Sequence, residues 1–315
     1  VLRGVDLTVR HGEAVGLVGE SGSGKSVTAM SVLRLLREPP ARLSGSIRFH
    51  GTAGGAPVDL AAVDPGSEQM QQIRGNDIAM IFQEPMSSLS PVFTIGHQVA
   101  EAIWLHQDKT RQQAHAEAEE IFQRVGIPEP ARAAKQYPHS LSGGQLQRVM
   151  IAMALACQPT LVIADEPTTA LDVTIQAQIM DLLQELRETL DLAVLLITHD
   201  LAVVAGFCER VNVMYMGRVV EEGSVLDIFQ RPSHPYTQGL LHSIPRPGQQ
   251  HKERFQAIRG TVPAPRQVPQ GCAFGPRCDQ FEANLCDRAG PVEAVQLGEG
   301  HHARCYRTDR VIHGG

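Results

Sequence analysis

The sequence predicts a protein of the α/β class, with a core of parallel strands and an inserted helical region. Three observations lead to this prediction. A short apolar segment at residues 14–18 runs directly into a glycine-rich loop and then a helical pattern. Residues 161–216 repeat a strand–helix–strand pattern, and residues 87–159 between these parts show helical periodicity. Strands that alternate with helices are typical of a parallel sheet covered by helices.

The amino-terminal elements follow from local patterns. Residues 25–36 are expected to form a helix, because apolar side chains recur at helical spacing before Pro39 and Pro40. Residues 47–49 lie between two glycines and indicate one strand of a hairpin. Residues 77–82 indicate a return to a buried strand.

The middle and later elements are assigned in the same way. A polar helix is expected over residues 110–125 and a more apolar helix over residues 144–156. The inward face of the first is expected to consist of Ala114, Ala118, Ile121, Phe122 and Val125. Further elements are strands at 161–164 and 193–198, a helix at 175–190, and a hairpin of residues 211–215 and 218–221 about Met216 and Gly217.

The composition is that of an ordinary globular protein and excludes several classes. The chain has 315 residues, of which 43% are hydrophobic and 20% charged. A net charge of −6 provides no basic field for nucleic acid or an anionic membrane. No apolar run approaches the ~18 residues of a membrane-spanning helix. We expect no secretory signal, because no basic segment followed by an apolar stretch occurs near Val1. Because the chain starts at Val1, close to a strand, we expect that natural residues precede it.

The glycine-rich loop at residues 19–26 fits the pattern Gly-x4-Gly-Lys-[Ser/Thr] in full. Backbone N–H groups of such a loop wrap phosphate groups, and the following helix N-terminus adds a favourable dipole. Lys25 is expected to reach the β- and γ-phosphates, and the Ser26 hydroxyl to bind Mg²⁺. The eight residues of the loop are Gly19, Glu20, Ser21, Gly22, Ser23, Gly24, Lys25 and Ser26.

A buried strand ends in the two adjacent carboxylates Asp165 and Glu166. Asp165 can hold the Mg²⁺ shell, and Glu166 can act as the general base or orient water for attack on the γ-phosphate. Read alone, this segment is equally a strand that ends in a polar turn. The phosphate loop earlier in the chain favours the functional interpretation.

A second candidate phosphate site opens the helix expected at 144–156. It consists of Leu141, Ser142, Gly143, Gly144 and Gln145. A serine hydroxyl, two glycines and a helix N-terminus together favour an anion. The alternative is an ordinary serine-capped helix. One nucleotide site needs only one such loop, so the second indicates a nucleotide held by another subunit.

The chain resembles an ABC transporter ATP-binding subunit over roughly residues 1–240. Six motifs occur in that family's order and spacing: Walker A at residues 19–26, the Q-loop at Gln83, the signature at 141–145, Walker B at 161–166, the D-loop at Ala170, Leu171 and Asp172, and the H-loop at His199. The resemblance implies a P-loop nucleotide-binding domain with a parallel-sheet core, an antiparallel β subdomain and a helical subdomain at about 87–159.

The resemblance also implies the role of each motif residue. Gln83 would contact Mg²⁺ and the attacking water; a solvated residue before Pro85 is the alternative. His199 would contact the γ-phosphate. Asp172 would lie at the dimer interface, or simply cap the next helix. The residues of the signature would bind ATP seated on a second ABC ATPase subunit, identical or different, and closure of the dimer would drive a permease. The family's adenine-stacking aromatic residue has no counterpart before Phe49. We expect that residues preceding Val1 supply it, and weaker adenine recognition is the alternative.

Two features favour the dipeptide, oligopeptide and nickel importer branch. The Q-loop continues as Gln83-Glu84-Pro85-Met86, and His234-Pro235-Tyr236-Thr237 precedes a proline-rich tail. The second motif alone could be only a helix start after proline. We therefore expect an ABC domain at 1–244 and a loop-rich extension at 245–315, which needs cross-links or metal to hold it.

The six cysteines fall into two groups. Cys157 and Cys208 lie in apolar stretches and are expected in the core. The other four are Cys272, Cys278, Cys286 and Cys305. In a chain with an intracellular nucleotide motif, clustered cysteines more often bind metal than form disulfides. No Cys-x2-Cys pair indicates a zinc ribbon. The resemblance implies a [4Fe–4S] cluster; zinc, free thiols or disulfides remain alternatives. His301 and His302 are expected in a solvated loop.

The function implied by the resemblance is ATP hydrolysis, with ATP and Mg²⁺, that powers import of di- or oligopeptides. Nickel or glutathione import remains open within transport, and a soluble ABC ATPase in DNA repair or translation is the alternative class. An exporter ATPase is disfavoured, because no membrane segment is fused to the chain. The implied partners are a second ATPase, two permease subunits and, indirectly, an external solute-binding protein, with no nucleic acid. The implied location is peripheral, on the cytoplasmic face of the plasma membrane.

Overall fold

The computed structural model describes residues 1–51, 56–169, 171–243, 258–264 and 267–308. The chain forms two units. The first contains residues 1–8, 14–28 and 196–315, and the second contains residues 9–13 and 29–195. The boundary expected between 244 and 245 falls outside the described residues, so the division into 1–244 and 245–315 stays a prediction. In the described part of the chain, no helix is long and apolar enough to cross a membrane.

The first unit is built on a sheet with the strand order β1-β7-β8-β10-β9. Only β1 and β7 run parallel; each later neighbour is antiparallel. The strands are β1 (Ala14–Val18), β7 (Arg210–Tyr215), β8 (Arg218–Ser224), β9 (Val295–Gly298) and β10 (His301–Ala303). All five residues of β1 are buried, as expected for a central strand. The predicted hairpin about Met216 and Gly217 is confirmed as β7–β8.

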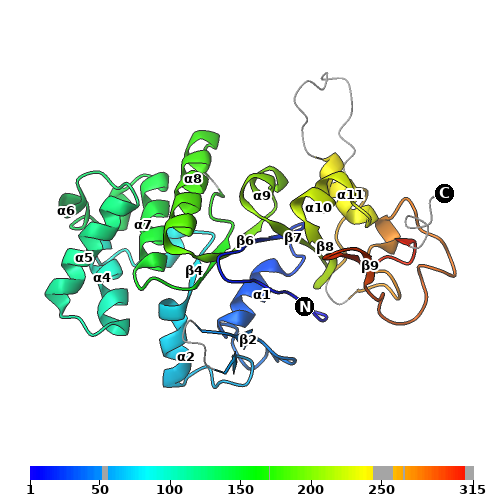
Figure 1. The fold of residues 1–315 in the computed structure, drawn as a ribbon, viewed down its shortest axis with the longest axis horizontal. Helices are drawn as coiled ribbons and strands as arrows, with labels where there is room; N and C mark the ends of the chain where they lie inside the picture. Colours follow the sequence, from blue (N-terminus) through cyan, green and yellow to red (C-terminus); the bar gives the residue numbers. More distant parts are fainter. Residues whose placement is uncertain (52–55, 170, 244–257, 265–266, 309–315) are drawn as a thin grey trace. The chain divides into compact units, whose positions relative to one another are not determined.

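Short helices complete the first unit. They are α9 (Leu201–Phe207), α10 (Val225–Gln230), α11 (Pro235–His242) and the turn η3 (Gly275–Arg277). The carboxy-terminal segment is not wholly irregular, because its strands β10 and β9 extend the sheet beyond β8 (Figure 1). Sequence periodicity did not reveal these strands, which have only three and four residues.

The second unit contains the parallel pair β4 (Ile78–Ile81) and β5 (Leu161–Asp165), and the antiparallel hairpin β2 (Arg48–Phe49) and β3 (Val58–Asp59). Its helices and turns are α2 (Glu68–Gln72), η1 (Ile73–Asp77), α3 (Pro85–Ser88), α4 (Ile95–His106), α5 (Arg111–Arg124), α6 (Pro130–Ala133), η2 (Pro138–Ser140), α7 (Gly143–Leu155) and α8 (Val173–Leu190). Helices α4, α5 and α7 contact one another, as Figure 1 shows in teal and green. The predicted helical region at 87–159 is therefore confirmed.

Two elements cross the boundary between the units. Helix α1 (Lys25–Val32) starts in the first unit and ends in the second, whereas β6 (Ala193–Thr198) does the reverse. The bounds of β6 are those predicted. Helix α1 is shorter than the predicted 25–36, because Arg34 adopts a left-handed backbone with φ +52°. The Arg74 guanidinium donates to the carbonyls of Leu33 and Arg34, at 2.7 and 2.9 Å, and so stabilises this early end.

Side-chain burial agrees with the helical pattern of α5. Its predicted inward residues are all buried: Ala114, Ala118, Ile121, Phe122 and Val125. Thr110 caps the helix, and Gln113 completes a reciprocal capping box. Cys157 and Cys208 are buried, as predicted for core cysteines.

Candidate functional site

The glycine-rich loop follows β1 and ends where α1 begins at Lys25, which is the arrangement predicted for a phosphate loop. Gly19 has φ +153°, and a Cβ there would stand 2.2 Å from the Met214 carbonyl oxygen. Only glycine therefore fits the first position of the loop. The Gly217 N–H donates to the Ser23 carbonyl at 2.7 Å, so the turn between β7 and β8 supports the loop.

Lys25 lies across the inside of this loop. Its ammonium donates to the carbonyls of Gly19 at 2.7 Å and Glu20 at 3.1 Å, and the residue is 5% exposed. Within the described residues, the buried Ser23 hydroxyl has no hydrogen-bond partner. The positioned Lys25 ammonium and the unsatisfied Ser23 hydroxyl fit a loop that binds phosphate oxygens.

The carboxyl ends of β4 and β5 bring two predicted residues together in the second unit. Ile81 pairs with Ala164 in register, so the residues that follow lie at one edge of this strand pair. The Gln83 side-chain amide donates to Glu166 Oε2 at 3.0 Å, and the Thr169 hydroxyl donates to the same oxygen at 2.9 Å. Asp165, the last residue of β5, is 4% exposed. The segment is thus a strand end with an oriented carboxylate.

Glu166 also has an unusual backbone. Its φ is +49°, in the left-handed region that residues other than glycine rarely occupy. Such a conformation persists only when its surroundings hold it, and functional sites are where it is commonest. The backbone and the two donors together fix the direction of the Glu166 carboxylate.

The signature segment is the start of α7. Ser142 is the N-cap, and Gln145 forms the reciprocal bonds of a capping box, with the Ser142 N–H donating to Gln145 Oε1 at 3.0 Å. Ser142 and Gly143 are exposed, and Leu141 is half-buried. A Cβ on Gly144 would stand 2.9 Å from Ile175. The serine-capped helix that we considered as the alternative is therefore present, and its first turn presents backbone N–H groups to solvent.

Two further motif residues occupy helix starts or strand ends. Asp172 is the N-cap of α8 and accepts from the Ile175 N–H at 3.0 Å, which confirms the capping interpretation. Ala170, its neighbour in the D-loop, lies outside the described residues. His199 is exposed directly after β6, between buried Thr198 and Asp200, the N-cap of α9. The phosphate loop and His199 belong to the first unit; Gln83, the signature, Asp165, Glu166 and Asp172 belong to the second.

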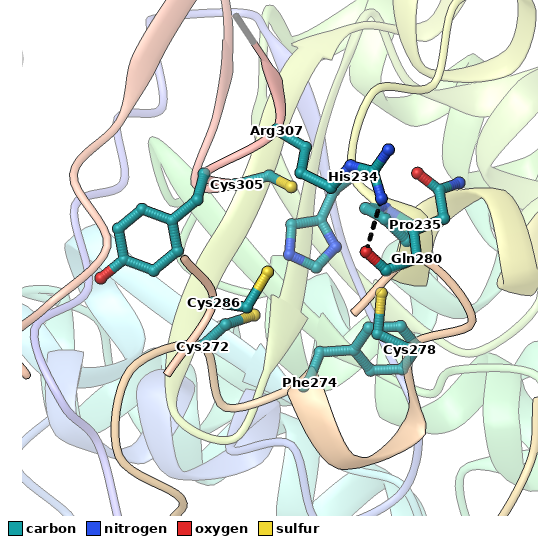
Figure 2. Close-up of a pocket in the computed structure, with 11 residues that line it drawn as sticks. His234, Pro235, Cys272, Phe274, Cys278, Gln280, Cys286, Cys305 and Arg307 are labelled. Carbon is teal, nitrogen blue, oxygen red and sulfur yellow. Dashed lines mark hydrogen bonds between the residues drawn. The ribbon is translucent and has the colours of Figure 1, made fainter. Parts of the chain in front are cut away.

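The four carboxy-terminal cysteines share one pocket of the first unit. Figure 2 shows their side chains gathered around it, with His234 and Phe274 beside them. All four are free thiols. Burial raises the pKa of Cys272 to about 11, and also raises the pKa values of Cys278 and Cys305. Among the described residues, no group of three or more His, Cys, Asp or Glu side chains is arranged to hold a metal ion. The four cysteines that the sequence singled out therefore do lie together. In the described residues, however, they are not positioned as the ligands of a metal ion.

A buried carboxylate next to this pocket was not anticipated. Glu221 accepts from the N–H groups of Ser233 at 2.7 Å and His234 at 2.9 Å, and lies 2.9 Å from His301 Nε2. His301 is 5% exposed in β10, so the prediction of a solvated loop was wrong. Burial lowers the pKa of His234 to about 4, despite the nearby Glu221 carboxylate.

The His-Pro-Tyr-Thr segment starts a helix, as its simplest interpretation predicted. His234 caps α11, and its Nδ1 accepts from the Tyr236 N–H at 3.1 Å. Tyr236 has a second contact that no local pattern indicated: its hydroxyl accepts from the Glu20 N–H of the phosphate loop at 2.8 Å. The carboxy-terminal part of the first unit therefore contacts the loop directly.

Two family models match the chain. The model described as ABC transporter matches residues 2–169, and the model described as oligopeptide/dipeptide transporter, C-terminal region, matches residues 220–286. The first covers just over half of the chain. The second includes most of β8, all of α11 and three of the four clustered cysteines.

Curated relatives are similar over nearly the whole chain. A protein of Brucella ovis named as a peptide import ATP-binding protein is 51% identical over 313 residues, 98% of this chain and 91% of the relative. A protein of Sinorhizobium fredii named as a peptide ABC transporter ATP-binding protein is 48% identical over 312 residues, 99% of this chain and 90% of the relative.

Solved structures show the same fold. The dimeric post-hydrolysis ATP-binding cassette MJ0796, bound to ADP and Pi, is 30% identical with a TM-score of 0.61, over 71% of this chain and 90% of the other. The cbiO1 protein of Clostridium perfringens, part of an ABC transporter complex, is 26% identical with a TM-score of 0.59, over 73% and 84%.

Proposed function

The chain belongs to the ABC transporter family of ATPases, and we propose that its ATP hydrolysis powers the import of di- or oligopeptides through a membrane permease. The observation that carries this proposal is the match of residues 220–286 to the C-terminal region of oligopeptide and dipeptide transporters. The Brucella and Sinorhizobium relatives, about half identical to this chain, have names that describe peptide transport. A soluble ABC ATPase of DNA repair or translation is not favoured, because the peptide-transporter region is present.

We propose the following role for each motif residue. Lys25 and the loop at 19–26 would bind the phosphates of ATP, and Ser26, Gln83 and Asp165 would hold Mg²⁺, which would neutralise phosphate charge. Glu166 acts as the general base, and His199 contacts the γ-phosphate. The support for these roles is the phosphate-loop conformation, the unsatisfied Ser23 hydroxyl and the Gln83–Glu166 hydrogen bond.

A second ABC ATPase subunit completes the proposed site. The first turn of α7, from Ser142 to Gln145, of which Ser142 and Gly143 are exposed, would bind ATP held by that subunit. Asp172 would lie near the dimer interface in addition to capping α8. The solved MJ0796 cassettes, which are about 30% identical to this chain, are described as dimeric and support this arrangement.

The remaining partners follow from the peptide-import role. Two permease subunits would receive the motion of the ATPase dimer, and an external solute-binding protein would deliver the peptide. The chain would then be peripheral, on the cytoplasmic face of the plasma membrane. Nickel or glutathione is the alternative cargo within this branch. The ABC domain at 1–244 and the extension at 245–315 are kept as the proposed division.

We further propose that Cys272, Cys278, Cys286 and Cys305 hold a [4Fe–4S] cluster. Four thiols that line one pocket supply the donor atoms that such a cluster takes. Because they are not arranged as ligands, cluster binding would draw the sulfur atoms together. Anaerobic purification followed by iron analysis and visible absorption tests this. A sample without iron and without the broad cluster absorption would contradict it.

The function is tested with the ATPase and permease reconstituted in vesicles together with the binding protein. Peptide should stimulate ATP hydrolysis, whereas nickel or glutathione should not. Glu166→Gln should abolish turnover yet retain ATP binding and trap a closed dimer, because the base alone is lost. Lys25→Ala should weaken ATP binding itself. A Glu166→Gln enzyme with the normal rate would refute the assignment of the base.

A further inference from the structure

Glu20, the second residue of the phosphate loop, forms a two-point ion pair with a distant arginine. Arg277 Nη1 lies 2.6 Å from Glu20 Oε2, and Arg277 Nη2 lies 2.9 Å from Glu20 Oε1. The Arg277 side chain is 4% exposed and the Glu20 side chain 29%. This bidentate geometry fixes the direction of the carboxylate as well as its distance.

The Arg277 guanidinium is held from several sides. Its Nε donates to the Arg259 carbonyl at 2.8 Å, and Nη2 donates to the Gly260 carbonyl at 3.3 Å. It also lies 5.9 Å from the ring centroids of Tyr215 and Phe274. The hydrogen bonds with Glu20 raise the pKa of Arg277 above its usual value, so the side chain stays charged. Arg277 is therefore already oriented toward Glu20.

A second contact reaches the same loop residue. The Glu20 N–H donates to the hydroxyl of Tyr236, which is fully buried and packs against Tyr215 and Phe274 at ring-centroid distances of 4.7 and 5.4 Å. The Glu20 carbonyl in turn accepts from the Lys25 ammonium. The backbone and the side chain of Glu20 are thus both fixed from the carboxy-terminal part of the first unit.

The charge of Glu20 makes this contact significant for nucleotide binding. The residue belongs to the loop that binds the triphosphate, so an unpaired carboxylate would repel the ligand. Arg277 offsets this charge and fixes the direction of the carboxylate. The surface pair of Arg259 and Asp279, in the same segment, has side chains 80% and 66% exposed and makes no such contact with the loop in the described residues.

We propose that Arg277 is a positioning residue for ATP binding. It neutralises the charge of Glu20 and holds this second residue of the phosphate loop in place. The proposal rests on the ATPase function above and adds a residue from the cysteine-bearing segment to the nucleotide site. It predicts that loss of Arg277 weakens ATP binding through Glu20, and that removal of the Glu20 charge restores it.

The test uses the full-length chain and titration with ATP and Mg²⁺. Arg277→Ala should raise the Kd for ATP roughly tenfold, the order expected for one unpaired charge within about 10 Å of an anion. Arg277→Ala combined with Glu20→Gln should return the Kd to within about threefold of wild type. Arg277→Lys keeps the positive charge but cannot form the two-point contact, so its Kd should lie between those of Arg277→Ala and the double variant. Arg259→Ala is the matched control and should bind as wild type does.

Thermal unfolding of the same variants separates this role from a structural one. If Arg277 acted only through packing, both Arg277→Ala and the double variant would be less stable, and the double variant would not regain affinity for ATP. An unchanged Kd in Arg277→Ala, or no recovery in the double variant, would overturn the proposal while wild-type ATP binding stands. If Arg277→Ala does not fold, Arg277→Lys with and without Glu20→Gln gives the same comparison. A wild-type chain that binds no ATP would instead contradict the function.

Discussion

Replacement of Glu221 by glutamine tests the buried network that joins β8, α11 and β10. The wild-type carboxylate accepts through Oε1 from the Ser233 N–H and faces His301, and accepts through Oε2 from the His234 N–H. Glutamine keeps the shape but presents only one acceptor oxygen. Whichever way the amide is oriented, at least one of the two backbone N–H groups loses its partner.

The expected size follows from this count. A buried donor that loses a charged acceptor costs about 2 kcal/mol, and the Glu221 side chain is fully buried. Because 1.4 kcal/mol corresponds to a factor of ten, local opening should become about 30-fold more frequent. The effect should be largest in the segment around Ser233 and His234, whose N–H groups lose the acceptor.

Hydrogen–deuterium exchange of the peptide that contains Ser233 and His234 is the direct measurement. Glu222→Gln is the matched control, because the neighbouring Glu222 forms a partly exposed pair with His302 at 3.1 Å. That pair should contribute less than about 1 kcal/mol. If Glu221→Gln exchanges no faster than Glu222→Gln, the network does not stabilise this segment and the reasoning is refuted.

Three further predictions concern stability. Burial lowers the pKa of His234 from its usual 6.5 to about 4, so the unfolded chain binds more protons between these pH values. Stability should therefore fall by up to about 1.4 kcal/mol per pH unit from pH 6.5 toward 4. His234→Asn should lack this slope in urea titrations at several pH values. Gly96→Ala should lower the free energy of unfolding by about 1–3 kcal/mol, because its Cβ would stand 2.7 Å from the Ala134 backbone. Gly206→Ala in α9 is the control: its Cβ would meet nothing within 4 Å, so it should be neutral or stabilising in the same urea titration. Asp172→Ala should cost about 1 kcal/mol through loss of the α8 cap, and Asp172→Asn should recover most of it; equal midpoints for the two variants would contradict the capping role.

Local patterns predicted much of the fold. The inward face of α5 and the limits of β6 were correct, because periodicity and burial act over a few residues. The end of α1 was placed too late, since the contacts that stabilise its early end come from Arg74, about forty positions further on. The strand β10 was missed for a similar reason: three residues carry little pattern, and their pairing with β8 is a tertiary event.

The sequence by itself determined the phosphate loop, the carboxylate pair at the end of β5 and the capped start of α7. Each is a short run of neighbouring residues whose chemistry depends on local backbone geometry. Only the tertiary structure decided that Gln83 contacts Glu166, that His301 is buried against Glu221, and that Arg277 pairs with Glu20. The last two partners stand 257 positions apart. Charges that meet over such a separation leave no periodic trace in the sequence, because the sheet and the packing of α11 and η3, not local spacing, bring them together.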